Sequence, residues 1–188
     1  MTDKRKFLKK ILRKQLIFKR KKNYTEINQN HISSIINFVK FNYKNIKLIG
    51  GYIPVNYEFD CLSILKCFEK ENYSIALPVI KDNFKMDFYK HSFQKPLKIN
   101  KFGIPEPYKL SKKIIPDLIF VPLVGFDSKL NRIGYGGGFY DRYFEKISKL
   151  KKINKIGLAF SFQKIKKLPI NNFDKKLDGI ITESKIKG

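Results

Sequence analysis

The sequence has no tryptophan, and only two cysteines and two histidines among its 188 residues. Cys61 and Cys67 are six positions apart inside an apolar helical pattern, a spacing that suits neither a CxxC redox pair nor a zinc knuckle. We interpret both as buried thiols. His31 and His91 belong to no Ser-His-Asp or Cys-His arrangement, so we interpret His31 as a packed or surface helix residue and His91 as a surface residue.

Long apolar runs are also absent. No stretch approaches the roughly 20 apolar residues that span a bilayer. Residues 1–22 are charged throughout and contain no apolar signal core. We therefore expect a cytoplasmic protein with no membrane partner. Its length favours a single domain over residues 1–188, because a chain of this size buries roughly 70% of its unfolded surface on folding.

Arginine is scarce although the chain is strongly basic. Lysine and arginine total 40 against 16 acidic residues, which makes the formal net charge +24. The arginines are Arg5, Arg13, Arg20, Arg132 and Arg142. Because groove readers tend to use the guanidinium fork, and because the lysines are spread along the chain, we expect no nucleic-acid partner. We interpret the charge as mostly solvated surface that reflects an AT-rich coding bias, although its field also suits recruitment of polyanionic small substrates.

Apolar periodicity predicts alternating helices and strands. Helical spacing covers residues 4–22, 25–41 with Thr25 as the cap, and 60–71. Short apolar runs bounded by turn residues predict strands over residues 46–55, 74–80, 85–89, 117–124, 155–160 and 179–182. The proline-rich segment 96–110 is interpreted as an irregular loop. This alternation predicts an α/β layered fold with a mostly parallel or mixed central sheet flanked by helices.

The most unusual stretch is residues 131–142, which read NRIGYGGGFYDR after a buried strand. Its glycines are Gly134, Gly136, Gly137 and Gly138. Without Cβ atoms, they let backbone N–H groups approach an anion closely. The apolar pattern resumes at Phe139 and Tyr143, so a helix should begin there with its N-terminus facing the same anion.

Two interpretations of this stretch stay open at this point, because it matches neither a Walker A motif nor the GxGxxG fingerprint. The glycines by themselves also suit a flexible turn. Arg132 and Asp141 on either side favour a phosphate site with magnesium, since a guanidinium neutralises phosphate and a carboxylate holds the metal. Tyr135, Phe139 and Tyr140 offer faces for stacking an aromatic ring, or for core packing.

The segment 122–142 resembles the 5-formyltetrahydrofolate cyclo-ligase family, also called 5,10-methenyltetrahydrofolate synthetase. The family motif is Pro-x-x-x-Phe-Asp, a short spacer, and then Arg-Leu-Gly-Tyr-Gly-Gly-Gly-Tyr-Tyr-Asp-Arg. Weaker similarity extends over residues 9–13, 52–58, 75–79, 103–107, 156–160, 168–169 and 174–183. The resemblance implies a NagB/RpiA-like fold. It also implies conversion of 5-formyltetrahydrofolate and MgATP into 5,10-methenyltetrahydrofolate, ADP and phosphate through a phosphorylated formyl group.

The resemblance also implies roles for individual residues. ATP phosphates would contact Lys9, Arg13, Arg132, Gly134, Gly136, Gly137 and Gly138. The folate would contact Ile53, Glu58, Tyr135, Phe139 and Tyr140, and magnesium would bind Asp141 and Asp174. Without the resemblance, Glu58 would be interpreted as a first-turn helix residue and Asp174 as a surface or capping residue.

The sequence departs from the family pattern at two positions. Phe139 replaces a usual Tyr, which keeps a stacking face and loses a hydroxyl, and Phe173 replaces a frequent His, which argues against an obligatory acid-base role there. We expect a monomer that binds small molecules. The alternatives are another phosphate-binding α/β enzyme, of the sugar-phosphate isomerase or acyl-CoA-utilising type, which would not need magnesium, and a basic nucleic-acid-binding protein.

Overall fold

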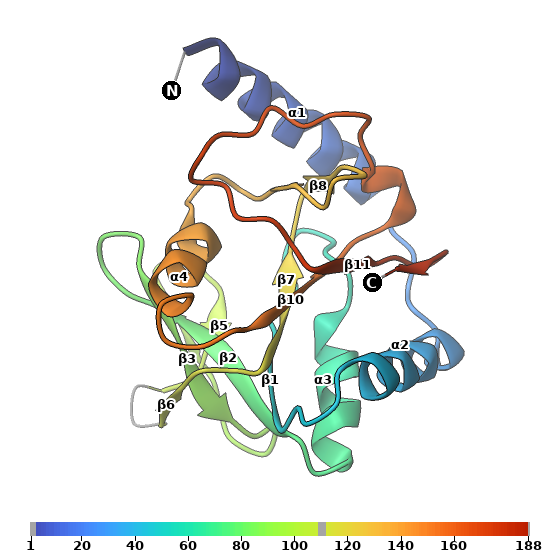
Figure 1. The fold of residues 1–188 in the computed structure, drawn as a ribbon, viewed down its shortest axis with the longest axis vertical. Helices are drawn as coiled ribbons and strands as arrows, with labels where there is room; N and C mark the ends of the chain where they lie inside the picture. The colour runs from blue at the N-terminus through green and yellow to red at the C-terminus, as the bar shows by residue number, and fades with distance from the viewer. Residues whose placement is uncertain (1–2, 109–111, 188) are drawn as a thin grey trace.

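The computed structural model describes residues 3–108 and 112–187, and a mixed eight-stranded sheet forms its centre (Figure 1). From edge to edge the strands are β12 (Ile186–Lys187), β11 (Gly179–Ile181), β10 (Asn154–Leu158), β7 (Leu118–Pro122), β1 (Leu48–Gly50), β2 (Ser74–Ile80), β3 (Met86–His91) and β6 (Lys113–Ile114). Strands β11, β10, β7, β1 and β2 are parallel to one another, whereas β12 pairs antiparallel with β11, β3 with β2, and β6 with β3. The predicted mostly parallel, mixed sheet is confirmed.

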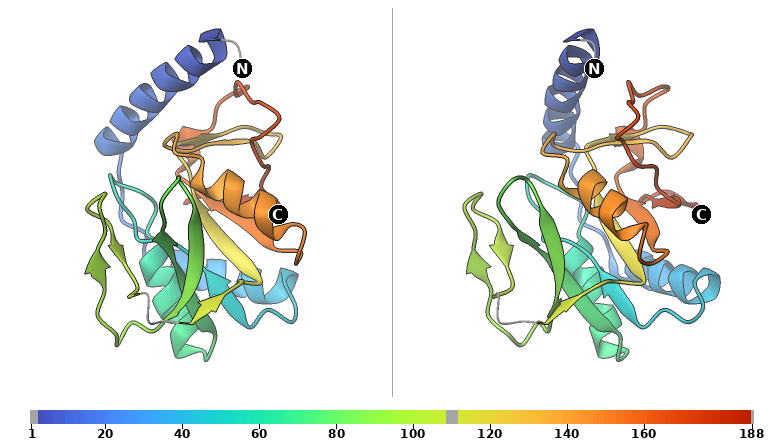
Figure 2. Two further views of the ribbon diagram at one scale, coloured as in Figure 1. Left: turned by 90° about the vertical axis from the view of Figure 1, so that its left-hand side faces the viewer. Right: turned by 60° about the vertical axis from the view of Figure 1, so that its left-hand side comes forward.

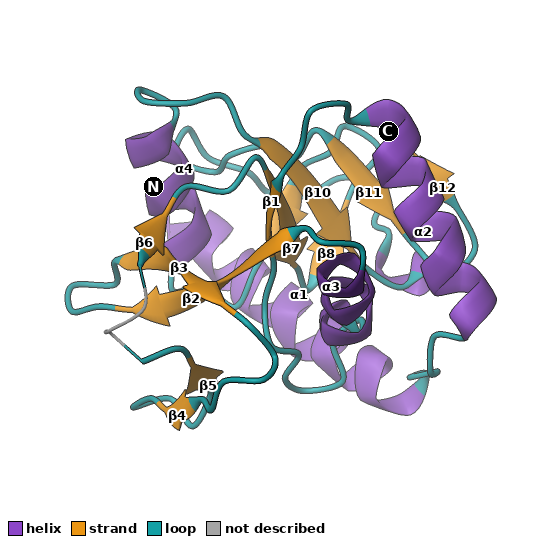
Figure 3. Cartoon of the chain, turned by 90° about the horizontal axis from the view of Figure 1, so that it is seen from below, coloured by secondary structure: helices purple, strands orange, loops and turns teal. Residues whose placement is uncertain are grey.

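Helices cover both faces of this sheet, as Figure 3 shows from below. Helices α2 (Gln29–Asn42) and α3 (Cys61–Lys70) pack on one face, and α4 (Phe139–Ile147) packs on the other. Strand β7 shows why both layers are apolar. Its side chains alternate between the two cores, with Phe120 facing α2 and α3 and Ile119 facing α4. Both side chains are fully buried.

Helix α1 (Asp3–Lys22) belongs to neither layer and lies beyond the carboxyl end of β7, at the top of Figure 1 and in both views of Figure 2. There the hairpin β8 (Gly125–Phe126) and β9 (Arg132–Ile133) follows β7. Leu16 of α1 packs against Val124, Ile133 and Leu168. The basic helix therefore sits at the edge where open α/β sheets bind ligands. No helix in the described part of the chain is long and apolar enough to cross a membrane.

Two predicted boundaries were wrong. Helix α2 begins at Gln29 instead of Thr25, because Asn28 is its N-cap and accepts a 2.9 Å hydrogen bond from the His31 backbone N–H. The strand predicted over 46–55 ends at Gly50, after which the chain leaves the sheet for a loop that contains Pro54. The Gly51 N–H still donates to the Ala76 carbonyl of β2 at 3.1 Å, but residues 51–55 belong to no strand. Proline cannot donate to a strand ladder, which agrees with a loop at Pro54.

The proline-rich segment 96–110 is not wholly irregular. It contains a short hairpin of β4 (Lys98–Ile99) and β5 (Pro105–Glu106), although residues 109 and 110 lie outside the described residues. The Asn100 side chain closes the turn by accepting from the backbone N–H groups of Phe102 and Ile104 at 2.9 and 3.2 Å. Two-residue edge strands tolerate Pro105 because few ladder bonds are needed.

Two single-residue interpretations also need correction. His91 was predicted at the surface, yet it is buried in β3 opposite Ile75 and meets the Phe93 ring edge-on. Burial lowers the pKa of His91, which keeps the imidazole neutral. Cys61 is a buried free thiol as predicted, whereas Cys67 is only partly buried.

A buried carboxylate connects α4 to the sheet. The Asp87 side chain on β3 is 4% exposed and forms ion pairs with Lys81 at 2.7 Å, Lys113 at 3.0 Å and Lys146 of α4 at 2.9 Å. Burial by itself would raise the pKa of Asp87, but the three ammonium groups lower it from 3.8 to about 2. The cluster therefore stabilises the position of α4 as long as Asp87 is ionised.

We expect Asp87→Asn to lower the free energy of unfolding by about 2 kcal/mol at neutral pH, measured by urea denaturation. Because the folded pKa lies below the unfolded one, the stabilisation is complete above about pH 4 and is lost as the pH falls towards 2. Asp82→Asn is the control, since the Asp82 side chain is 96% exposed in its pair with Lys101. Equal stability of the two variants at pH 7 would contradict the proposed role of Asp87.

Candidate active site

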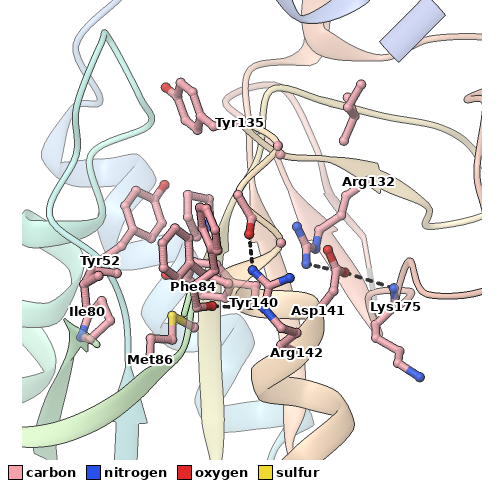
Figure 4. Close-up of a pocket in the computed structure, with 18 of the residues that line it drawn as sticks. Tyr52, Ile80, Phe84, Met86, Arg132, Tyr135, Tyr140, Asp141, Arg142 and Lys175 are labelled. Atoms are coloured by element: carbon pink, nitrogen blue, oxygen red, sulfur yellow. Dashed lines mark hydrogen bonds and ion pairs between the residues drawn. The ribbon is translucent and has the colours of Figure 1, made fainter. Parts of the chain in front are cut away.

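One cavity of about 1220 Å³ opens at the carboxyl end of the sheet, between α1, the glycine stretch, the β2–β3 turn and the β4–β5 hairpin. All the site residues predicted from the sequence line this cavity, and Figure 4 shows several of them. They are Lys9, Arg13, Ile53, Glu58, Arg132, Gly134, Tyr135, Gly136, Gly137, Gly138, Phe139, Tyr140, Asp141 and Asp174. The fold thus brings together α1, three loops and the start of α4.

The glycine stretch forms a loop whose carbonyls face arginines. Arg13 Nε donates to the Gly134 carbonyl at 2.7 Å, and the Arg142 guanidinium donates to the Gly137 carbonyl. Gly136 and Gly138 have φ angles of 108° and 66°, which residues with a side chain rarely adopt. Within residues 3–108 and 112–187, no protein acceptor is recorded for the N–H groups of the four glycines in this loop. The loop therefore presents backbone donors that suit an anion at the start of α4.

Two carboxylates lie beside this loop, each paired with a cation. Arg132 is buried and donates to Asp141 Oδ1 at 2.8 Å, and the backbone N–H of Lys175 donates to the same oxygen at 3.0 Å (Figure 4). Lys9 Nζ lies 2.5 Å from Asp174 Oδ2. Lys9 is buried whereas Lys10 is exposed, so Lys9 is the lysine that faces the cavity.

The two carboxylates fit a magnesium ion that also binds phosphate. Asp141 and Asp174 line the same cavity, and the backbone N–H of Lys175, the residue after Asp174, donates to Asp141. No group of three or more metal-binding side chains occurs among the residues that the structure describes. Magnesium is usually held by one or two carboxylates, with substrate phosphates and water completing its octahedral shell. The donor set therefore suits a metal that arrives with a nucleotide.

A third carboxylate, Glu58, lies deep in the other half of the cavity. Its side chain is buried, and Oε2 accepts from the Val55 backbone N–H at 2.9 Å. Burial raises the pKa of Glu58 to about 7, although this hydrogen bond and the nearby Arg20 oppose the shift. Glu58 Oε1, Arg132 Nε and the Tyr140 hydroxyl are buried without a partner in the described part of the chain. Unpaired buried polar atoms are rare in proteins, so three on residues that line one cavity indicate a ligand.

Aromatic rings line the mouth of the cavity. The Phe139 ring contacts Phe84 and Phe102, with centroids 5.9 and 6.0 Å apart. Arg142 lies over the Phe84 ring at 5.5 Å and donates to the Phe84 carbonyl at 3.0 Å. Phe84 and Phe102 remain more than half exposed.

Sequence reasoning missed several lining residues, namely Phe84, Phe102, Arg142 and Lys175. Arg142 could have been found, because it is the last residue of the glycine stretch. The two phenylalanines come from turns that carry no motif and reach the cavity only through the β2–β3 turn and the β4–β5 hairpin. Lys175 follows a predicted ligand but contributes through its backbone N–H, which no sequence pattern reveals.

The fold and this cavity define an α/β enzyme in which an anion-binding loop and an aromatic-lined pocket with a buried carboxylate form one site. A model of the 5-formyltetrahydrofolate cyclo-ligase family matches residues 4–183. The chain belongs to the 5-formyltetrahydrofolate cyclo-ligase family.

Individual relatives agree with this assignment. The 5-formyltetrahydrofolate cyclo-ligase of Haemophilus influenzae is 33% identical over 144 residues, which are 73% of this chain and 76% of that protein. The Mycoplasma pneumoniae cyclo-ligase is 32% identical over 180 residues, 93% of this chain and 98% of the relative. A solved structure of the Aquifex aeolicus 5,10-methenyltetrahydrofolate synthetase superposes with a TM-score of 0.74 at 29% identity, over 95% of this chain and 91% of that one.

We expect Glu58→Gln to stabilise the ligand-free protein above pH 7 by up to about 3 kcal/mol. The carboxyl titrates at about 7 when folded and at 4.5 in the unfolded reference, so between these values the folded chain keeps a proton that the unfolded chain has lost. Stability from this group therefore falls as the pH rises through that window. Urea denaturation at pH 4.5 and pH 8 measures the effect.

The control for this prediction is Glu71→Gln, which removes a half-exposed partner of Lys40. It should change stability by less than about 1 kcal/mol. If Glu58→Gln shows no gain at pH 8 over pH 4.5, then the carboxyl is not forced to hold its proton by burial.

Proposed function

We propose that the chain catalyses the ATP- and magnesium-dependent cyclisation of 5-formyltetrahydrofolate to 5,10-methenyltetrahydrofolate, with release of ADP and phosphate. One observation carries this proposal: the glycine loop with its available N–H groups and the buried, unpaired Glu58 line the same cavity. A phosphate donor and a ring system with hydrogen-bond donors can therefore bind side by side. Membership of the cyclo-ligase family supports the same reaction.

The chemical difficulty is a poor electrophile. The formyl carbon on N5 must be attacked by N10 of the same molecule, which is a weak nucleophile, and the formyl oxygen must then leave. Transfer of the γ-phosphoryl group of ATP to that oxygen solves both problems. N10 then bonds to the activated carbon and gives up its proton, and the carbon–oxygen bond breaks as phosphate departs with the bonding electron pair and takes up that proton. Such a sequence needs positioning and charge neutralisation instead of a protein nucleophile.

The cations of the cavity suit the phosphates. We assign Lys9, Arg13 and Arg132 to ATP oxygens, and the amides of Gly134, Gly136, Gly137 and Gly138 to the transferred phosphoryl group. Arg13 is already oriented by its bond to the Gly134 carbonyl, and Lys9 and Arg132 are largely buried, so their charges act in a region of low dielectric.

Asp141 and Asp174 are the residues that would hold magnesium. When bound, the ion neutralises the charge of the phosphate oxygens. Without magnesium, Lys9 pairs with Asp174 and Arg132 pairs with Asp141. On nucleotide binding, these two side chains would exchange their carboxylate partners for phosphate oxygens. Lys175 and Glu145, which form an ion pair, connect the Asp174 loop to α4 and keep the two carboxylates together.

Glu58 is assigned to the N–H donors of the pterin ring. Ligand donors would satisfy its orphaned Oε1 and lower its pKa, because hydrogen bonds to a carboxylate favour the charged form. Ile53, Tyr135, Phe139 and Tyr140 provide the apolar faces on which the folate rings pack. We further propose that the enzyme acts as a single-domain monomer in the cytoplasm without a nucleic-acid partner, where free Cys61 and Cys67 would stay reduced.

The decisive assay mixes purified protein with 5-formyltetrahydrofolate and MgATP and follows the absorbance band of the methenyl product together with ADP. We expect the band to grow only when both ATP and magnesium are present. Growth of the methenyl band without magnesium would show that Asp141 and Asp174 do not act as metal ligands in the reaction. A folded protein that binds ATP but forms no band would favour another phosphate-dependent substrate, such as a sugar phosphate or an acyl-CoA precursor.

Asp141→Asn should lower kcat/KM for MgATP by at least about 100-fold while leaving the melting temperature close to that of the parent protein. The amide keeps an acceptor for the Lys175 N–H and removes the charge that magnesium needs. Asp178→Asn is the matched control, because Asp178 pairs with Lys155 outside the cavity. Full activity in Asp141→Asn would show that this carboxylate is not a metal ligand.

A further inference from the structure

Arg20, in the last turn of α1, has no place in the reaction described above, yet it is 1% exposed and is the largest of the fully buried side chains in the described residues. It does not line the cavity. A buried guanidinium is costly unless it is fully hydrogen-bonded, so its partners indicate what it is for.

The partners of Arg20 come from three different segments at the carboxyl edge. Nε donates to the Asn56 carbonyl at 2.9 Å, Nη1 donates to the Leu123 carbonyl at 3.2 Å, and Nη2 donates to the Tyr135 hydroxyl. The guanidinium carbon also lies 5.6 Å from the centre of the Tyr135 ring. One side chain thus joins the β1–α3 loop, the end of β7 and the glycine loop.

The β1–α3 loop needs such support because its backbone is strained. Asn56 and Tyr57 have φ angles of 50° and 62°. Asparagine tolerates this left-handed conformation, but it is unfavourable for a bulky residue such as Tyr57. The next residue is Glu58, whose carboxylate receives the Val55 N–H from the same turn. Strain of this kind persists only where the surroundings impose it, and the bond from Arg20 to Asn56 is one such constraint.

No carboxylate forms an ion pair with Arg20 among the described residues, so its charge is not neutralised by direct contact. Glu58 in turn has a buried carboxylate oxygen, Oε1, without a hydrogen-bond partner in the described part of the chain. Tyr135 interacts with both groups: its hydroxyl accepts from Arg20, and a side-chain hydrogen bond from Tyr135 lowers the pKa of Glu58, which lines the same cavity. The three side chains therefore form a series of cation, hydroxyl and carboxylate.

We propose that Arg20 is a positioning residue for the folate side of the cavity, which holds Tyr135 and the 55–58 turn in one arrangement and supplies the positive charge opposite Glu58. This inference rests on the proposed function for the identity of the ligand. Arg20 itself does not touch the ligand. It acts through the Tyr135 hydroxyl and the Asn56 carbonyl.

The other titratable groups around Glu58 stay neutral near pH 7. They are Tyr52 before α3, Cys61 on α3, Tyr135 on the glycine loop and Tyr140 on α4. Burial raises the pKa of each of them, that of Tyr135 to about 12. Arginine remains charged at all these pH values. Burial raises the pKa of Glu58, and Arg20 is the charged group that lowers it, together with a hydrogen bond from the Tyr135 hydroxyl.

The test compares Arg20→Met, Arg20→Lys and Tyr135→Phe with the parent protein. Lys22→Met is the matched control, because it removes an exposed positive charge from the same helix turn. The titration of Glu58 in the ligand-free protein is followed by carbon NMR of labelled glutamate carboxyls. The KM for 5-formyltetrahydrofolate and the Kd for ATP are then measured for each folded variant.

We expect Arg20→Met to raise the pH at which Glu58 titrates by about one unit, and Tyr135→Phe to raise it by less. Arg20→Lys keeps the charge but cannot make three directed bonds, so its titration should stay near that of the parent. Both Arg20 variants should raise the KM for the folate about tenfold or more, whereas the Kd for ATP changes less than about twofold. Lys22→Met should change none of these values.

Equal losses of folate and ATP binding would overturn the proposal, because they would show that Arg20 only supports the fold. An unchanged Glu58 titration in Arg20→Met would overturn it as well. If Arg20→Met does not fold, Tyr135→Phe and Arg20→Lys carry the same comparison. If the parent protein makes no methenyl product, the proposed reaction is wrong, and the NMR titration still decides whether Arg20 and Glu58 are coupled.

Discussion

The packing of α1 across the carboxyl edge of the sheet is the interaction on which the rest of the site depends. Leu16 buries its side chain against Val124 and Leu168, and this small apolar contact sets which side of a strongly basic, mostly exposed helix faces the protein. Lys9, Arg13 and Arg20 then lie on the inner side, where they reach the Asp174 loop, the glycine loop and the β1–α3 loop. A shift of α1 would disturb all three loops together.

The cavity separates two electrostatic environments along its length. Beside the glycine loop, Lys9 pairs with Asp174 and Arg132 pairs with Asp141, so both carboxylates are already balanced, and the proposed MgATP would bind by exchange of these partners. Around Glu58 the cavity is lined by aromatic side chains, and burial of the carboxylate there raises its pKa to about 7. Both features are expected of a binding site, because stability given up at a site can be recovered when the ligand supplies the missing partners.

The sequence predicted the core of the fold well and its edges poorly. Long periodic segments such as α1 and β2 were identified, because buried faces repeat along the chain with the period of a helix or a strand. The two-residue strands β6, β8, β9 and β12 carry no such period and form only because a neighbouring strand offers hydrogen bonds. His91 was misplaced for a related reason, since the polarity of a residue does not show which strand will cover it.

What the sequence by itself determined is the family to which the protein belongs and the local segment that carries the family motif. Gly134, Gly136, Gly137 and Gly138, with Arg132 and Asp141 beside them, are recognisable without the structure, because backbone freedom and adjacent charges are local properties of the chain. Only the tertiary structure decided which distant residues join that site. Lys9 meets Asp174 from 165 positions away, and Arg20 meets Tyr135 from 115. Contacts over such separations arise from the packing of whole elements, and no local pattern in the chain encodes them.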